Sequence, residues 1–309
     1  MSPSVAVLGV GKMGAGFVRR LRECGHELII WNRTKEVSKA IAEEQEKDTP
    51  CHVAESPGDA CSALSEGGLV IIMLANIATV REVIFEASVL PTLSGKIICN
   101  IVSGNPDEGR SVAAELKWSG ASCIDGAYSG SPAKARAGEG QLFVSSDDGG
   151  KVVETWRHVL ESLGKVTFAG KVGSARALDY AVVDLYFVNY LCFAANAAML
   201  EAEGVDVSQF AAEAGVRLGQ VPPMLEAFSE RMKSRDEASY LEAPSATLGT
   251  WKNFWGSRLP YFDAHGFPSQ LARFNVRLLE EAIGAGGAHA KADVTRLQEV
   301  VRHTTSAPK

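Results

Sequence analysis

Short apolar runs alternate with longer amphipathic stretches through the first 170 residues of the chain. The apolar runs predict β-strands at Val5–Leu8, Glu27–Trp31, Leu69–Leu74, Lys96–Asn100, Ser122–Ile124, Gln141–Ser145 and Lys165–Phe168. Leu69–Leu74 and Lys96–Asn100 are continuously apolar, which is typical of central parallel strands that are covered on both faces. The alternation of strands and helices therefore predicts a doubly wound α/β domain.

The pattern changes after Gly173. Strand signals end there, Ala, Leu and Glu become frequent, and the sequence predicts one long helix over Ser174–Glu203, followed by shorter helices to about His303. We therefore expect an α/β domain over residues 1–170 and an all-α domain, beginning with the long helix, over residues 171–303. A disordered tail is expected over residues 304–309.

A glycine motif follows the first strand directly, with the sequence Gly9-Val-Gly11-Lys-Met-Gly14. In this spacing Gly9 permits the tight turn, Gly11 leaves room for a pyrophosphate, and Gly14 lets the next helix pack close to the sheet. The N–H groups at the helix start then face the phosphates. The position between a strand and a helix favours a Rossmann-type dinucleotide site over a glycine-rich turn that binds nothing.

The end of the second strand indicates which dinucleotide is bound. An NAD site usually has Asp or Glu there to bind the ribose 2′-hydroxyl, whereas this chain has Asn32, Arg33, Thr34 and Lys35. Arg33 can pair with a 2′-phosphate and stack on adenine, so the sequence predicts NADPH. Thr34 can add a hydrogen bond to the phosphate, can cap the following helix, or can do both.

One face of the long predicted helix carries Asp179, Val183, Tyr186 and Tyr190. A carboxylate and two phenols on an apolar stripe form a candidate active site beside the nicotinamide. Partial burial of Asp179 is expected to raise the pKa of its carboxyl, so that it could hold a proton near neutral pH. The alternative is a structural hydrogen bond from Asp179 and a packing role for the tyrosines.

Composition sets limits on partners and location. The chain is 46% hydrophobic and 22% charged with a net charge of −6, which gives no support for nucleic acid or an anionic membrane as a partner. Asp184, Asn189 and Asn196 interrupt the apolar stretch Ala181–Leu200, which favours a buried helix over a membrane span. The six scattered cysteines predict reduced thiols and no metal site. Without a signal-peptide pattern, a cytoplasmic location is expected.

Several segments together resemble the β-hydroxyacid dehydrogenase superfamily, and more closely its imine reductase and reductive aminase branch. Gly9–Gly14 matches the opening motif, and Trp31–Thr34 is similar to the NADPH motif of that branch. Ile97–Arg110 resembles its strand and loop beside the nicotinamide. Gly173–Asp179 resembles the start of its interdomain helix, with Asp at the catalytic position, and Leu259–Glu281 also resembles the branch. The resemblance implies a homodimer in which helices of one subunit complete the other's site.

The departures from the superfamily pattern narrow the chemistry. Hydroxyacid dehydrogenases carry a catalytic Lys in a Gly-x-x-x-Lys pattern, whereas here Gly173 is followed by Ser174, Ala175, Arg176 and Ala177. Because the helix has no Lys, alcohol oxidation is poorly supported.

Other positions mix features of the two groups. Asp125-Gly-Ala-Tyr-Ser-Gly130 resembles the substrate motif of the hydroxyacid enzymes, with Ser129 near the substrate. Ser103 stands where some reductive aminases have Asn. Phe187 stands where several imine reductases have a catalytic Tyr, with Tyr186 one residue earlier. These exchanges bear on substrate scope and stereochemistry.

The function that the resemblance implies is NADPH-dependent reduction of C=N bonds, including reductive amination of a carbonyl compound with an amine. One alternative is a reductase of aldehydes or short oxo acids that uses Ser129, with Arg176 or Lys134 as the anion anchor. Another is a catalytically silent NADP-binding dimeric scaffold. The predicted catalytic residues are Asp179, Tyr186, Ser129 and Ser103.

Two further sets complete the predicted site. The predicted cofactor-binding residues are Gly9, Val10, Gly11, Lys12, Met13, Gly14, Asn32, Arg33, Thr34, Lys35, Leu74, Ala75, Asn76, Asn100 and Val102. The predicted wall of the substrate cleft consists of Tyr128, Phe187 and Trp251, with Phe254 and Trp255 as further candidates. Aromatic residues are commonly core or dimer contacts instead, so this alternative remains open for each of the five.

Overall fold

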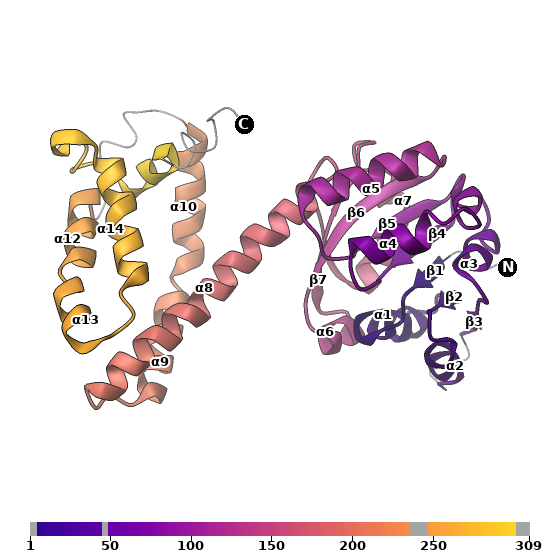
Figure 1. Cartoon of the computed structure of the whole chain (residues 1–309), viewed down its shortest axis with the longest axis horizontal. Helices are drawn as coiled ribbons and strands as arrows, with labels where there is room; N and C mark the ends of the chain where they lie inside the picture. Colours follow the sequence, from indigo (N-terminus) through magenta and orange to yellow (C-terminus); the bar gives the residue numbers. More distant parts are fainter. Residues whose placement is uncertain (1–4, 45–48, 235–245, 301–309) are drawn as a thin grey trace. The chain divides into compact units, whose positions relative to one another are not determined.

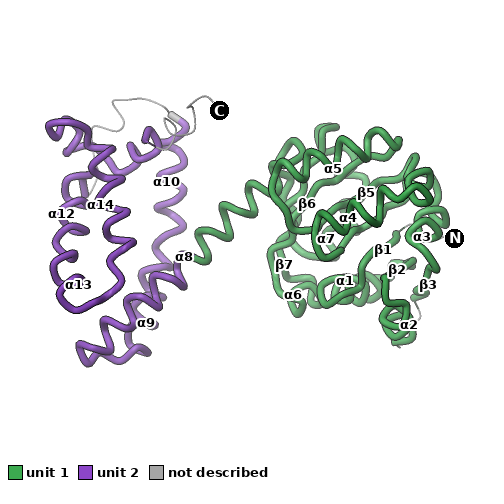
Figure 2. The backbone as a smooth tube through the Cα atoms, in the orientation of Figure 1, with its two compact units in different colours: residues 1–187 green, residues 188–309 purple. Residues whose placement is uncertain are grey.

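The computed structural model describes residues 5–44, 49–234 and 246–300. The chain divides into two compact units, residues 1–187 and 188–309, which are coloured separately in Figure 2. The long helix α8 (Ser174–Ala202) runs from the first unit into the second. The predicted change from alternating strands and helices to helices alone is confirmed, since β8 ends at Phe168 and α8 follows.

The first unit is built on one sheet, with strand order β3-β2-β1-β4-β5-β6-β7-β8 among the described residues (Figure 1). Its strands are β1 (Val5–Leu8), β2 (Leu28–Trp31), β3 (Cys51–Val53), β4 (Leu69–Ile72), β5 (Ile97–Asn100), β6 (Ser122–Ser129), β7 (Gly140–Ser145) and β8 (Gly164–Phe168). Neighbouring strands are parallel except β6 and β7. The strand order reverses between β1 and β4, and ligands of such sheets bind at the carboxyl ends of the strands at that point.

The seven predicted strands are confirmed, with small changes at their ends. The strand expected at Ser122–Ile124 continues to Ser129, because its second half pairs antiparallel with β7 and is not an apolar run. Gly126 lies close to β7 there, where an added Cβ would be 3.1 Å from the carbonyl oxygen of Phe143. The edge strand β3 was not predicted because it is short and its central residue, His52, is exposed.

Helices cover both faces of the sheet. In the first unit they are α1 (Lys12–Glu23), α2 (Lys35–Glu43), α3 (Pro57–Ser62), α4 (Ile77–Ile84), the 3-10 helix η1 (Leu90–Leu93), α5 (Pro106–Trp118), α6 (Pro132–Ala137) and α7 (Lys151–Ser162). Alternate strand residues face opposite sides, as the pleat requires. Val5 and Val7 pack with α1 and α7 on one face, whereas Ala6 and Leu8 pack with α3, α4 and α5 on the other.

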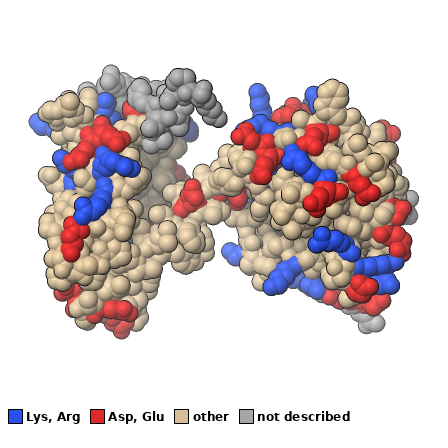
Figure 3. Space-filling model, in the orientation of Figure 1, with Lys and Arg blue, Asp and Glu red and all other residues tan. Residues whose placement is uncertain are grey.

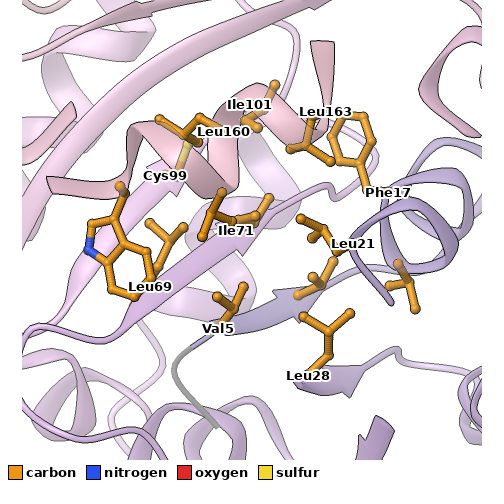
Figure 4. Packing of buried hydrophobic residues seen from close by; sticks show 14 of the residues in the cluster. Val5, Phe17, Leu21, Leu28, Leu69, Ile71, Cys99, Ile101, Leu160 and Leu163 are labelled. Atoms are coloured by element: carbon orange, nitrogen blue, oxygen red, sulfur yellow. The ribbon is translucent and has the colours of Figure 1, made fainter. Parts of the chain in front are cut away.

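Figure 4 shows the first of these two layers, where Phe17 and Leu21 of α1 approach the apolar side chains of the central strands. Phe17, Leu21, Leu69 and Ile71 are fully buried. Burying each such side chain stabilises the fold by about 1.5–3 kcal/mol relative to exposure. This packing fixes α1, and with it the glycine motif, against the carboxyl ends of β1 and β4.

The second unit is helical throughout its described residues. Its helices after α8 are α9 (Val207–Leu218), α10 (Val221–Ser234), α12 (Leu248–Gly256), α13 (Leu259–His265) and α14 (Gln270–Ile283), with short 3-10 helices η2 (Ala285–Gly287) and η3 (Val294–Arg296). A small core joins α12 to α14 through Leu248, Leu279 and Ile283. The predicted tail at residues 304–309 lies outside the described residues.

Helix α8 differs from the expectation in one respect. Its apolar stretch was predicted to be buried, but none of its most apolar window is buried by the described residues of this chain. Leu185, Tyr186, Phe187 and Leu191 are each more than half exposed. By length and composition alone the helix would suffice to cross a membrane. The most apolar window of α8 is therefore not buried within the described part of the chain, where the sequence predicts burial.

Candidate functional site

The glycine motif forms the turn from β1 into α1. Gly9 has φ +98°, and a Cβ there would collide with the carbonyl oxygen of Met73 in the neighbouring chain segment after β4. A Cβ at Gly14 would collide with the carbonyl oxygen of Gly9. At Gly11, by contrast, an added Cβ would meet no described atom within 4 Å. Gly9 and Gly14 thus serve the close packing, and Gly11 leaves open space at the helix start.

The backbone N–H groups of the first turn of α1 lie at this open space. The backbone hydrogen bond from Ala15 N to the Gly11 oxygen closes the first turn of α1 at 2.8 Å. The N–H groups ahead of Ala15 therefore have no acceptor within the helix. Together with the helix dipole, they favour a negatively charged group at this point. The arrangement fits a pyrophosphate, as the motif predicts.

The end of β2 is tied to the glycine motif by Asn32. Its Oδ1 accepts a hydrogen bond from Val10 N at 3.2 Å, and its Nδ2 donates to the Thr34 carbonyl at 3.2 Å. Thr34 occupies the N-cap position of α2, but its side chain makes no capping hydrogen bond to the described residues. Thr34 is therefore the N-cap residue, as the capping alternative has it, but it caps through its backbone carbonyl, which accepts from Val37 N at 3.2 Å, and not through its hydroxyl.

The basic residues after β2 differ in their partners. The Lys35 ammonium pairs with both carboxylate oxygens of Glu55, which follows β3. Arg33 has no hydrogen bond or ion pair with the described residues, and it lines the cofactor cleft. Arg33 is thus the cation that is available to a 2′-phosphate, whereas Lys35 is engaged elsewhere.

A cleft of about 470 Å³ lies over the carboxyl ends of β1, β2, β4 and β5. Eleven predicted cofactor residues and one predicted catalytic residue line it: Gly9, Gly11, Lys12, Met13, Gly14, Asn32, Arg33, Thr34, Leu74, Ala75, Val102 and Ser103. Five lining residues were not predicted: Trp31, Met73, Thr79, Val83 and Ile101. Trp31, Met73 and Ile101 lie at or just after the ends of strands, and Thr79 and Val83 lie on α4, half-buried. Their ordinary apolar or hydroxyl side chains gave no signal in the sequence.

Four predicted cofactor residues act beside the cleft rather than on its wall. Val10 and Lys35 make the contacts just described. Asn76 caps α4, since its Oδ1 accepts from Thr79 N at 2.8 Å. Asn100 is fully buried at the end of β5, where its Oδ1 accepts from Val102 N at 3.2 Å. These contacts hold the lining segments in place.

A buried ion pair lies where α8 begins. Arg176 Nε donates to Asp125 Oδ1 at 2.7 Å, and both side chains are 1% exposed. The other carboxylate oxygen of Asp125 accepts from Gly173 N at 2.9 Å. Asp125 lies beside Asn100 in the register of β5 and β6. In the sequence, Arg176 was a candidate anion anchor in the segment where hydroxyacid dehydrogenases carry a catalytic Lys. In the structure its guanidinium is instead paired with Asp125.

Asp179 lies one helical turn beyond Arg176. Its side chain is half-buried, and its Oδ1 is buried without a hydrogen-bond partner among the described residues. Burial raises the pKa of this carboxyl above its ordinary value, while the positive charge of Arg176 acts in the opposite direction. The expected rise in the pKa of Asp179 is therefore confirmed.

The remaining predicted residues are not brought to the cofactor cleft. Tyr128 packs edge-on against Phe17 with 4.8 Å between ring centroids, and its hydroxyl donates to the Leu163 carbonyl at 3.2 Å. Its assignment to the substrate wall is therefore wrong: the pleat of β6 turns this ring into the core beneath α1. Ser129 ends β6 and does not line the cleft.

The other three lie on helices and are not among the residues that line this cleft. Tyr186 and Phe187 are exposed on α8, at 62% and 56%. Trp251 lies in the second unit, on α12, with its ring 5.7 Å from that of Phe254. Their predicted roles at the substrate remain predictions.

The surface charge and the possible metal ligands were compared over the described residues. Figure 3 shows acidic and basic side chains interspersed on the visible faces of both units. Among the described residues, no group of three or more His, Cys, Asp or Glu could hold a metal ion.

The sheet, the glycine turn and the cleft define a dinucleotide-binding domain of the doubly wound class. The family model described as the NAD binding domain of 6-phosphogluconate dehydrogenase matches residues 4–173, more than half of the chain. The chain belongs to this family.

Similar proteins extend the comparison over the whole chain. An NADPH-dependent reductive aminase from Aspergillus oryzae is 27% identical over 97% of both chains. A reductive aminase from Aspergillus terreus, solved with NADPH and ethyl levulinate, has a TM-score of 0.80 at 22% identity and covers 98% of this chain and 100% of its own. An imine reductase variant from Myxococcus stipitatus, solved with NAD+, has a TM-score of 0.82 at 22% identity over 97% and 100%.

These comparisons confirm the predicted resemblance to the imine reductase and reductive aminase branch. They also confirm the predicted fold, with a Rossmann-type domain followed by a helical region. The chain is accordingly an oxidoreductase that uses a nicotinamide cofactor.

Proposed function

We propose that this protein reduces C=N bonds with NADPH, converting an imine or iminium ion to an amine. The observation that carries the proposal is Asp179, a half-buried carboxyl with a raised pKa and an unpartnered buried oxygen, at a helix start that has no Lys. A Lys would suit reversible oxidation of an alcohol. A lone carboxyl suits a substrate that carries or gains positive charge. The relatives of the reductive aminase and imine reductase type support the same chemistry.

In this account the bound cofactor supplies a hydride, and the protein supplies position and charge. The amides at the start of α1 would hold the pyrophosphate, and Arg33, which lines the cleft, would hold the 2′-phosphate. Asp179 stabilises the iminium charge as a carboxylate, or donates a proton to the nitrogen as an acid. Ser103, on the cleft wall, orients the substrate or relays the proton.

The preference for NADPH rests on the groups at the end of β2. No acidic side chain follows this strand until Glu36, so the usual carboxylate for the ribose 2′-hydroxyl is missing. Arg33 is available in the cleft, and its guanidinium can form two hydrogen bonds with a phosphate. Such contacts are worth about 1.5–3 kcal/mol each to a charged group.

A homodimer is part of the same proposal. The exposed apolar side chains of α8 include Val183, Val188 and Leu191. Soluble proteins rarely leave contiguous apolar patches of this kind uncovered. We infer that the α8 helix of a second copy covers them. These apolar side chains would face the same apolar side chains of the second copy, so a two-fold interface would be self-complementary.

The substrate panel that tests the proposal contains a cyclic imine, a ketone with an amine, glyoxylate and succinic semialdehyde. Oxidation of NADPH is followed with each substrate in turn. Turnover with the imine, or with ketone and amine together, supports the proposal. Turnover with the oxo acids alone would contradict it and favour the oxo-acid reductase. Binding of NADPH without turnover of any substrate would contradict it in favour of the scaffold.

A further inference from the structure

Arg176 reaches beyond its ion pair into the wall of the cofactor cleft. Its Nη1 donates to the carbonyl oxygen of Val102 at 2.6 Å and lies 3.4 Å from that of Gly104. Val102 and Ser103 line the cleft. A side chain at the start of α8 is therefore bonded to the backbone of the loop that follows β5.

The Val102 peptide is held on both sides by buried side chains. Asn100 Oδ1 accepts from Val102 N, and Arg176 Nη1 donates to Val102 O. Asn100 is 0% exposed and Arg176 is 1% exposed. Water does not compete with hydrogen bonds in such buried surroundings, so these bonds are stronger and keep the backbone in one position. The pair fixes the loop at the point where it enters the cleft.

The surroundings of Arg176 are shaped for a guanidinium. Gly109 of α5 lies against the ion pair, and an added Cβ would be 2.6 Å from Arg176 Nε and 2.8 Å from the Asp125 oxygens. At Gly104 an added Cβ would be 3.2 Å from Arg176 Nη1. Two glycines thus make the room in which Arg176 spans from β6 to the loop.

Stability alone does not account for this arrangement. Replacing a buried ion pair by apolar or neutral groups of similar size is often neutral or stabilising. Arg176 Nη2 is buried with no hydrogen-bond partner among the described residues, which carries a further desolvation cost. The pair therefore costs free energy that its contacts to the loop and to α8 must offset.

We propose that Arg176 is a positioning residue: with Asp125 it holds the Val102–Gly104 loop in the cofactor cleft and fixes the first turn of α8. Asp179 follows in the next turn of the same helix, so the pair sets the loop and the carboxyl relative to one another. The effect on the cofactor follows from the fold alone, and the effect on turnover rests on the proposed function. Arg176 itself need not touch substrate.

The test uses the full chain and the double variant Asp125→Asn/Arg176→Met. This variant leaves no buried charge unpaired, and the new amide can still accept from Gly173 N. Hydrogen exchange of the amides of residues 102–105, the dissociation constant of NADPH, kcat and KM are measured together with thermal unfolding. We expect exchange of these amides to rise at least about tenfold, NADPH to bind more weakly, and kcat to fall about tenfold to a hundredfold. Unfolding should remain close to wild type.

Arg22→Met is the matched control. Arg22 is a second buried arginine, 4% exposed, whose Nη1 donates to the Ile41 carbonyl at 3.0 Å and whose Nε donates to that of Thr49 at 3.4 Å. It holds backbone that does not line the cofactor cleft. This variant should lose stability, while exchange at residues 102–105, NADPH binding and kcat stay at wild-type values.

The outcomes separate this proposal from the proposed function. Wild-type exchange at residues 102–105 in the double variant would overturn the positioning role, whether or not imines are reduced. Increased exchange with unchanged NADPH affinity would overturn it as well. If the wild type reduces no imine, the exchange rates and the NADPH affinity still test the positioning role. If the wild type reduces imines, an unchanged kcat in the double variant would show that the loop does not position the reaction.

Discussion

At the scale of single residues, the chemistry depends on where charge is left unpaired. Asp125 and Arg176 neutralise each other in the core, and Lys35 is neutralised by Glu55. In the proposed function, Arg33 in the cleft and Asp179 on α8 are the charged groups that act on a ligand.

The first prediction concerns the pH dependence of stability. Because burial raises the pKa of Asp179 in the folded state, the folded protein binds this proton more tightly than the unfolded chain does. The stability from this group is fully present below its ordinary pKa of about 3.9, and it is lost as pH rises through the raised folded value. Asp179→Asn removes the titration. Urea unfolding at several pH values should show the wild type losing free energy of unfolding relative to the variant as pH rises. A wild type that keeps or gains free energy of unfolding relative to Asp179→Asn as pH rises would contradict the assignment.

The second prediction concerns cofactor selection by Arg33. Arg33→Ser should weaken NADPH binding about tenfold to a hundredfold, because a charge-assisted contact to the 2′-phosphate is lost. Binding of NADH, which has no 2′-phosphate, should change little and serves as the control. Titration of cofactor fluorescence measures both. Equal losses for the two cofactors would show that Arg33 supports the fold of the cleft instead.

Residues were predictable from the sequence where a backbone requirement fixes the residue type. Gly9 and Gly14 are such positions, since a Cβ at either collides with backbone. Tyr128 was not, because the sequence near Ser129 did not show which face of β6 the ring would take, and it lies in the core. The Arg176–Asp125 pair spans 51 residues of sequence, and no local pattern signals such a contact.

At the scale of elements, the turn from β1 to α1 combines two separate glycine functions. Gly14→Ala should prevent close packing of α1 on the Gly9 carbonyl and destabilise the fold. Gly11→Ala has open space and an extended backbone, with φ −63° and ψ −169°, so the fold should remain. Its Cβ would instead occupy the space for the pyrophosphate.

Thermal unfolding and NADPH titration separate these two effects. We expect Gly11→Ala to keep a melting temperature near that of the wild type and to bind NADPH at least about tenfold more weakly. We expect Gly14→Ala to lower the melting temperature itself. Wild-type NADPH affinity in Gly11→Ala would mean that the pyrophosphate does not lie at this helix start.

The elements themselves were largely predictable, because buried parallel strands are continuous apolar runs. The exceptions have physical reasons. Strand β3 is short and lies at the sheet edge, and the second half of β6 is held by pairing with β7 through small and polar residues. Long-range pairing of this kind is not visible in local periodicity.

At the scale of the whole molecule, the proposed homodimer depends on the apolar surface of α8. The composition of this helix predicted burial, whereas the described residues of the chain do not bury its most apolar window. Leu191→Glu places a charge at a side chain that is 58% exposed in the single chain. In a dimer this charge would be desolvated, so dissociation is expected.

Light scattering coupled to size-exclusion chromatography measures the mass of each variant. The wild type should elute as a dimer and Leu191→Glu should shift toward the monomer. Trp118→Glu is the control, since Trp118 is 93% exposed at the end of α5 and away from α8 in the sequence. A monomeric wild type, or a Leu191→Glu protein that stays dimeric, would contradict the proposed interface.

The most direct measurement of the central claim is steady-state oxidation of NADPH with a cyclic imine, comparing wild type with Asp179→Asn. We expect turnover by the wild type and a loss in kcat of roughly 10²–10⁴-fold in the variant, as for removal of a general acid or base. NADPH affinity should stay unchanged, because Asp179 does not line the cofactor cleft. Wild-type turnover of the imine by Asp179→Asn would contradict the account, as would a wild type that reduces oxo acids and leaves the imine untouched.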